Sequence, residues 1–116
     1  YDKNANATKR ERELKAADRI FNILPEDQAK KLRGLWDEFE EYQTPEAKFA
    51  HVMDNLAPVM LSDAVGGKSW KEHGVFENQV YGRNKRTPEG SETLYQVIDE
   101  VFRKNIQLGN IKGDNK

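Results

Sequence analysis

The segment Thr44–Leu61, TPEAKFAHVMDNLAPVML, is the part of the sequence that says most about the architecture. Thr44, Pro45 and Glu46 are typical of a helix start. Threonine caps free backbone amides, proline fits the first helical position, and an acid interacts favourably with the positive end of the helix dipole. Apolar residues then recur at helical spacing, with expected inward positions at Ala47, Ala50, Met53 or Asp54, Ala57 and Leu61. The segment predicts a helix over residues 45–64.

Similar signals predict three more helices, near residues 9–23, 26–42 and 92–107. Thr8, followed three residues later by a glutamate, matches a capping box for the first of them. Ser91 is the expected cap of the last, whose apolar residues keep strict helical spacing. No stretch alternates as a strand would, so the sequence predicts an all-α protein.

The chain length of 116 residues fits one domain, which we expect to span residues 1–116. The least regular part is residues 68–90, where we expect a loop with one or two short helical turns. We interpret residues 1–8 as the end of an upstream linker and residues 110–116 as a polar tail.

Composition excludes several classes of function. The 19 Lys and Arg residues nearly balance 20 Asp and Glu residues, so no net field attracts nucleic acid or an anionic membrane. The chain contains no cysteine, so any metal must be held by His, Asp or Glu, and this composition fits a cytoplasmic location. No apolar run approaches the roughly 20 residues that a membrane-spanning helix needs.

Asp54 is the first candidate for chemistry, because it lies on or beside the apolar face of a predicted helix. A carboxylate that loses hydration needs a cation or a hydrogen-bond donor. Pro58, four residues later, has no amide hydrogen to donate to the Asp54 carbonyl, so we expect a kink there. The alternative from periodicity alone is that Asp54 is a solvated acid one position away from the apolar stripe.

The other candidate residues carry weaker signals. His51 lies one turn before Asp54, but two ligands do not make a metal site, and we interpret His51 as a surface residue. Gly67-Lys68-Ser69 lacks the strand and the first glycine of a phosphate-binding loop. Trp70 and His73 share one short turn and are pocket candidates, although an anchoring role is commoner for a buried tryptophan.

Several of these motifs together resemble the HD-superfamily metal-dependent phosphohydrolases, which include small 5'-deoxynucleotidases. The most specific blocks are Leu35-Trp36-Asp37-Glu38-Phe39-Glu40, Thr44-Pro45-Glu46-Ala47-Lys48-Phe49-Ala50 followed by Asp54, and Ser69-Trp70-Lys71-Glu72-His73-Gly74. The resemblance covers nearly the whole chain. It implies an HD-domain-like helical bundle, incomplete at its N-terminal side.

The resemblance also implies a divalent metal cofactor and a nucleoside 5'-monophosphate substrate. The family's metal site is written H…HD…D, and its closing aspartate follows the TPEAxFA block, so this role falls on Asp54. The other ligands and the catalytic residues would lie upstream of Tyr1, and we expect the isolated chain to be inactive. Phosphomonoester hydrolysis by this route needs a metal-bound water, which one aspartate cannot assemble.

A second hypothesis is a non-catalytic helical protein-interaction module that binds a partner through its apolar faces. Under either hypothesis we expect no nucleic-acid or membrane partner. We expect a homodimer, because uncovered apolar positions would be paired most simply by a second copy. The positions expected to be uncovered are Leu35, Phe39, Met53, Ala57 and Leu61.

Overall fold

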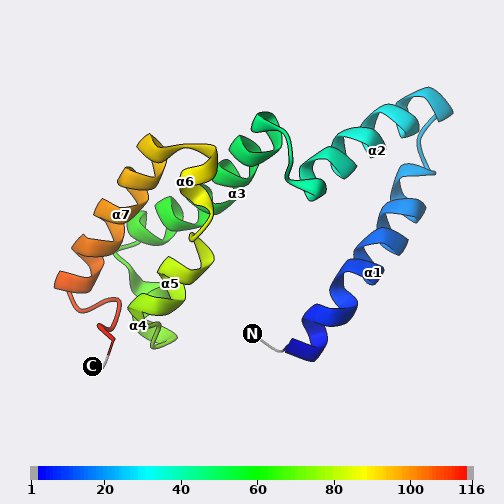
Figure 1. The fold of residues 1–116 in the computed structure, drawn as a ribbon. Helices are drawn as coiled ribbons and strands as arrows, with labels where there is room; N and C mark the ends of the chain where they lie inside the picture. Colours follow the sequence, from blue (N-terminus) through cyan, green and yellow to red (C-terminus); the bar gives the residue numbers. More distant parts are fainter. Residues whose placement is uncertain (1–2, 115–116) are drawn as a thin grey trace. The chain divides into compact units, whose positions relative to one another are not determined.

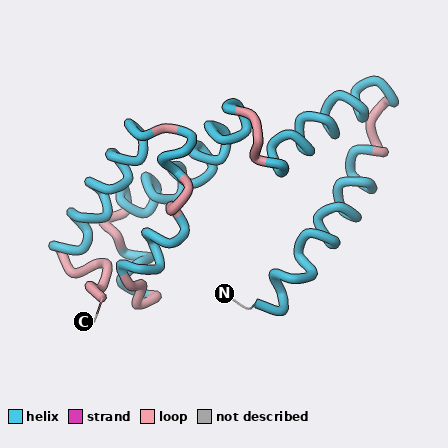
Figure 2. Tube along the Cα trace, in the orientation of Figure 1, coloured by secondary structure: helices cyan, strands magenta, loops and turns pink. Residues whose placement is uncertain are grey.

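The computed structural model describes the backbone of residues 3–114, and this part of the chain consists of helices and loops without a strand (Figures 1 and 2). The all-α class predicted from the sequence is therefore confirmed. None of these helices is both long enough and apolar enough to cross a membrane. The helices are α1 (Lys3–Phe21), α2 (Glu26–Glu41), α3 (Pro45–Ala64), α4 (Lys68–Glu72), α5 (Glu77–Arg83), α6 (Thr87–Gly90) and α7 (Glu92–Gln107).

The chain divides into two compact units between Glu41 and Tyr42, and each unit is described by itself. The first unit contains α1 and α2, and the second contains α3 to α7. The single domain expected over residues 1–116 stays a prediction.

The first unit is a helical hairpin organised around Trp36 of α2. The guanidinium groups of Arg10 and Arg33 lie 5.6 and 5.3 Å from the centre of the Trp36 ring, and Phe21 packs at 6.4 Å. Arg33 also donates hydrogen bonds to Asp18 of α1 and Asp37 of α2. No residue of α2 is fully buried, so the described contacts between the two helices involve side chains that remain partly exposed to solvent.

Helix α1 begins at Lys3, earlier than the sequence predicted, so the expected capping box at Thr8 is wrong. Residues 3–8, expected as a linker, are helical, while residues 1–2 lie outside the described part. The Thr8 hydroxyl donates back to the carbonyl of Ala5 at 3.4 Å. This bond is the usual alternative for a threonine inside a helix, where no free amide is available to cap.

The core of the second unit lies between α3, α5 and α7. It consists of the buried residues Val59, Trp70, Val80, Ile98, Phe102 and Ile111. The Phe102 ring meets the edges of Trp70 and Tyr81 at centroid distances of 6.1 and 5.2 Å. Figure 1 shows α7 running beside α3, with α6 packed against both helices.

Helix α3 begins as the sequence predicted. The Thr44 hydroxyl accepts a hydrogen bond from the Ala47 amide at 3.1 Å, and Pro45 occupies the first turn. The helix continues through Pro58 to Ala64. Ser91 likewise caps α7 by accepting from the Leu94 amide at 3.2 Å.

The face of α3 that packs inward differs from the predicted one. The buried residues are Ala47, Val52 and Val59, of which only Ala47 was expected. Met53, Ala57 and Leu61 of the predicted inward stripe are exposed instead. Helix α3 is apolar on both sides, so periodicity predicted the helix correctly but could not say which side meets α6 and α7.

The C-terminal end of α3 is tied to α7 by a polar network. Asp63 accepts hydrogen bonds from Lys104 at 2.8 Å and from Asn105 at 3.0 Å. Asn105 is almost completely buried, and its side-chain oxygen accepts from Asn110 at 2.9 Å. The Lys104 ammonium holds the pKa of Asp63 below its ordinary value, with a further contribution from Asn105.

Residues 110–114 pack against the second unit, so the expected polar tail is wrong for this part. Ile111 is buried in the core. The Lys112 backbone bonds to both sides of the α4–α5 connection, donating to the Val75 carbonyl at 2.9 Å and accepting from the Glu77 amide at 2.8 Å. A single isoleucine between polar residues carries no periodicity, which is why the sequence did not reveal this contact.

Candidate functional site

Asp54 lies in the middle of α3 with an exposed side chain. Within the second unit, this side chain faces away from the buried core. Two residues along a helix correspond to a rotation of about 200°. Because the preceding Val52 faces the core, Asp54 is turned away from α6 and α7. Its role as a metal ligand stays a prediction.

Asp54 adjoins an apolar surface that we call the outer face of α3. It consists of Phe49, Ala50, Met53, Ala57, Met60, Leu61 and Ala64, all of which are exposed except the half-buried Ala50. Asp54 stands one turn from Ala50 and from Ala57 at the edge of this face. An exposed apolar patch of this kind is typical of an interaction surface.

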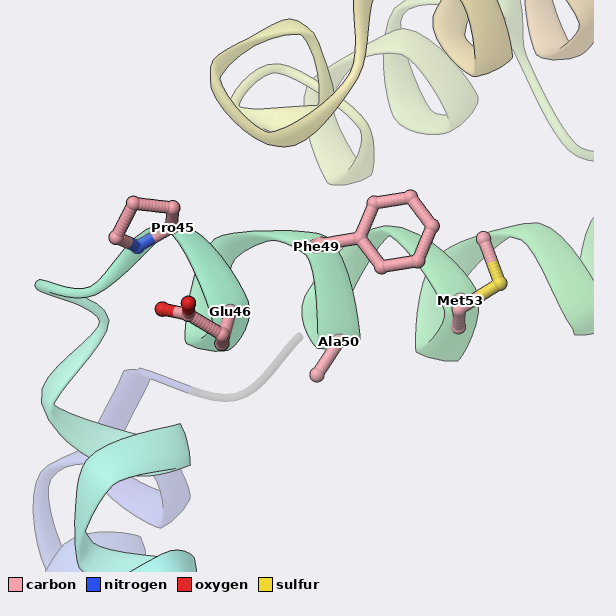
Figure 3. Close-up of a pocket in the computed structure, with 5 residues that line it drawn as sticks. All are labelled: Pro45, Glu46, Phe49, Ala50 and Met53. Carbon is pink, nitrogen blue, oxygen red and sulfur yellow. The ribbon is translucent and has the colours of Figure 1, made fainter.

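The N-terminal half of the outer face contains an open cavity of about 590 Å³. Figure 3 shows its lining residues, with Pro45 at the helix start, Glu46 on the first turn, Phe49 and Ala50 together on the next, and Met53 one turn further along α3. The lining is apolar except for the Glu46 carboxylate. Such a surface fits an apolar side chain of a partner better than a charged group.

His51 is half-buried and packs against the side of Tyr42, with 5.0 Å between ring centroids. The Tyr42 ring is also covered by the Arg86 guanidinium at 4.1 Å, and its hydroxyl donates to the Arg86 carbonyl at 3.1 Å. Burial is the main cause that raises the pKa of Tyr42, and the Arg86 guanidinium lowers the pKa of Glu89. His51 thus packs into an aromatic and ionic cluster, and its interpretation as a surface residue that is not a ligand stays a prediction.

The two pocket candidates have different environments. Trp70 packs in the core against Phe102. This is the anchoring role that the sequence offered as the alternative to a pocket role. His73 is exposed, and its Nδ1 lies 2.8 Å from the Ser69 carbonyl oxygen. The pocket role of both residues stays a prediction.

A polar pocket that the sequence did not reveal lies between α5 and α7, with a volume of about 610 Å³. The Tyr81 hydroxyl donates to Asp99 at 2.6 Å, and Arg103 donates to the other oxygen of the same carboxylate side chain at 2.8 Å. Burial, followed by Asp99, raises the pKa of Tyr81 to about 12. Tyr81 therefore stays protonated, and the cluster joins the two helices.

The described residues do not by themselves complete a metal centre. Between residues 3 and 114, no group of three or more His, Cys, Asp or Glu side chains is placed to hold a metal ion. Asp54 offers one carboxylate, whereas catalytic metal sites use about three protein ligands.

The all-α fold agrees with the comparison with known families. The model of the HD domain family matches residues 1–95, so the chain belongs to the HD domain family. A solved structure of a predicted metal-dependent phosphohydrolase from Magnetospirillum magnetotacticum MS-1 has the same fold, with a TM-score of 0.83 and 35% identity. The superposition covers 96% of this chain and 55% of that protein.

The curated relatives are similar over a shorter stretch. The proteins named 5'-deoxynucleotidase HDDC2 from mouse and from human are each 38% identical to this chain over 52 residues. The match covers 45% of this chain and 26% of each relative. The matched stretch thus spans about a quarter of the length of these relatives, and the superposition spans about half of the solved structure.

Proposed function

We propose that this chain contributes to a metal-dependent phosphohydrolase acting on nucleoside 5'-monophosphates, with Asp54 as one ligand of a divalent cation. The observation that carries the proposal is the position of Asp54, which follows the TPEA block and is exposed at the edge of an uncovered apolar face. The names of the mouse and human relatives support the substrate class. The bound cation would supply an activated water and offset phosphoryl charge.

In this proposal, the chain presents the Asp54 carboxylate on helix α3. Thr44 caps the start of α3, and Asp63 ties its end to α7, so the helix is held at both ends around Asp54. The proposal further includes a homodimer, because the outer face of α3 is apolar and exposed. The alternative function, a non-catalytic interaction module, is favoured by the same face.

The first experiment measures phosphate release from nucleoside 5'-monophosphates by the 116-residue chain with Mg²⁺, Mn²⁺ or Co²⁺. We expect no release, because the described residues do not complete a metal centre. Metal-dependent release that Asp54→Ala abolishes would contradict this expectation.

The second experiment tests Asp54 directly. The matching part of the Magnetospirillum protein is replaced by this chain, and bound metal and phosphate release are measured in the chimera. We expect Asp54→Asn to lower both, whereas Glu46→Gln, which removes an exposed carboxylate two turns earlier on the same helix, leaves both unchanged. Equal effects of the two substitutions, or none from Asp54→Asn, would disprove the ligand role.

A further inference from the structure

The junction between the two units has an unusual backbone conformation. Two residues, Tyr42 and Gln43, separate the last residue of α2 from the Thr44 cap of α3. Tyr42 has a φ of 57°, and it is the one non-glycine residue with a positive φ in the part of the chain that the structure describes. This left-handed conformation is unfavourable for a residue with a Cβ atom, so other contacts must hold it.

The Tyr42 side chain is held by residues of the second unit. The Arg86 guanidinium covers the Tyr42 ring at 4.1 Å, and the Tyr42 hydroxyl donates to the Arg86 carbonyl at 3.1 Å. Arg86 is itself fixed by an ion pair with Glu89 at 2.8 Å. The His51 ring meets the Tyr42 ring edge-on at 5.0 Å, and the Lys48 ammonium lies 5.8 Å from its centre. All of these partners follow Tyr42 in the chain and belong to the same unit as Tyr42.

We propose that Tyr42 is a latch on the junction between the two units. Its ring, held by Arg86 and His51, keeps the junction backbone in the left-handed conformation. Release of the ring lets the junction open locally while the core of the second unit stays folded, because Tyr42 is not part of that core. The latch thus sets how freely the chain can turn at the boundary between the units, and it does not depend on metal binding or hydrolysis.

Limited proteolysis of the full chain measures this local opening. Endoproteinase Glu-C cuts after Glu41 only when the junction is open, and mass spectrometry identifies the fragments 1–41 and 42–116. When closing is faster than cutting, the cleavage rate follows the population of the open form. We expect Tyr42→Ala to raise this rate at least about tenfold, because it removes the cation–π contact, the edge-on ring contact and the hydroxyl bond together.

A comparison of alanine with glycine tests whether the ring holds an unfavourable backbone. In an ordinary loop, the glycine variant is cut faster than the alanine variant, because glycine is more mobile. For the latch we expect the reverse order. Tyr42→Gly should be cut about five- to thirtyfold more slowly than Tyr42→Ala, because glycine adopts a positive φ without the cost that alanine has there. Tyr42→Phe, which keeps the ring, should give the smallest increase over wild type.

Two further variants test the partner and the specificity of the cut. Arg86→Ala alone should raise the cleavage rate about two- to fivefold, because it removes the guanidinium over the ring. In the Tyr42→Ala background the same change should have little effect, since the two side chains act as a pair. Tyr95→Ala is the matched control, because Tyr95 on α7 is half-buried as Tyr42 is. It should leave cleavage after Glu41 unchanged.

Three results would overturn the proposal. The first is equal acceleration by Tyr42→Ala and Tyr95→Ala, because cleavage would then follow unfolding of the whole second unit. The second is faster cleavage of Tyr42→Gly than of Tyr42→Ala. The third is a double variant in which the effects of Tyr42→Ala and Arg86→Ala multiply as independent changes.

Discussion

Replacing Gly67 by alanine tests the junction that holds the end of α3. Gly67 is buried, with a positive φ of 72°. A methyl group there would lie 2.5 Å from both the Asn105 oxygen and the Asn110 nitrogen. Since these atoms are bonded to each other at 2.9 Å, neither can move without disturbing the network that ties α3 to α7.

The expected loss of stability has two parts. A left-handed backbone costs a non-glycine residue roughly 1–2 kcal/mol. Displacing the two amides weakens three hydrogen bonds, those that join Asn105 to Asp63 and Asn110 to Asn105 and Gly66. At about 0.5–1.5 kcal/mol each, the three bonds contribute about 1.5–4.5 kcal/mol, so the total loss is about 2.5–6.5 kcal/mol.

Gly66→Ala is the matched control. Gly66 has nearly the same φ, 74°, but nothing lies within 4 Å of an added methyl group. It therefore carries the backbone cost alone, and the two variants should differ by about 1.5–4.5 kcal/mol. For a domain of this size, that difference corresponds to roughly 10–20 °C in Tm.

The assay is urea unfolding followed by the fluorescence of Trp70 in a Trp36→Phe background. Trp70 lies in the core of the second unit, whereas Trp36 belongs to the first unit and would mix its signal into the transition. Equal losses for Gly66→Ala and Gly67→Ala would refute the reasoning, because backbone conformation alone would then explain both.

Two further predictions concern the second unit. Gly90→Ala should lower the free energy of unfolding by about 3 kcal/mol, because the new methyl group would lie 2.5 Å from the Lys48 carbonyl oxygen of α3. Gly82→Ala is the control, because open space surrounds Gly82. It should raise the free energy of unfolding by about 0.5–1 kcal/mol in the same urea assay. Asp63→Asn should lose about 1 kcal/mol at neutral pH, a figure reduced for the solvent exposure of Lys104. Because the folded-state pKa of Asp63 is lowered, its contribution is complete above the unfolded-state pKa and is lost as pH falls through the folded-state value. Wild type and Asp63→Asn should therefore converge in stability in acid, and a constant difference down to low pH would contradict the assignment.

Local signals in the sequence were sufficient for most helix positions. The bounds of α3 and α7 were predicted within a residue, because Thr44 and Ser91 are caps whose chemistry acts within one turn. The start of α1 was predicted incorrectly, because a capping pattern does not always lie at the end of a helix. Thr8 and Glu11 satisfy a capping pattern, but nothing upstream stops the helix, and capping residues occur inside helices as well.

Contacts between distant segments were not predictable in the same way. Ile111 enters the core because the backbone of Lys112 pairs beside Val75 and Glu77, and no periodic pattern marks such a contact. The Tyr81–Asp99 bond likewise joins two helices whose mutual position the sequence does not contain. Tertiary placement requires the packing of the whole unit.

The candidate site shows the same limit. The resemblance selected Asp54 from the order of motifs, and the structure places it on a helix that is held at both ends. The side of α3 on which Asp54 lies could not be predicted, because Val52 and Met53 both fit an apolar stripe. One of them is buried and the other exposed, and only the positions of α6 and α7 decide between them.

Covering the outer face of α3 would affect the proposed role of Asp54 as a metal ligand. Any partner that covers Met53 and Ala57 also removes water from the neighbouring Asp54 carboxylate, and an unpaired carboxylate resists that loss. A divalent cation bound to Asp54 offsets this cost, so cation binding and coverage of the outer face favour each other by linkage. If Asp54 binds a cation, its affinity for that cation should therefore be higher when the outer face of α3 is covered.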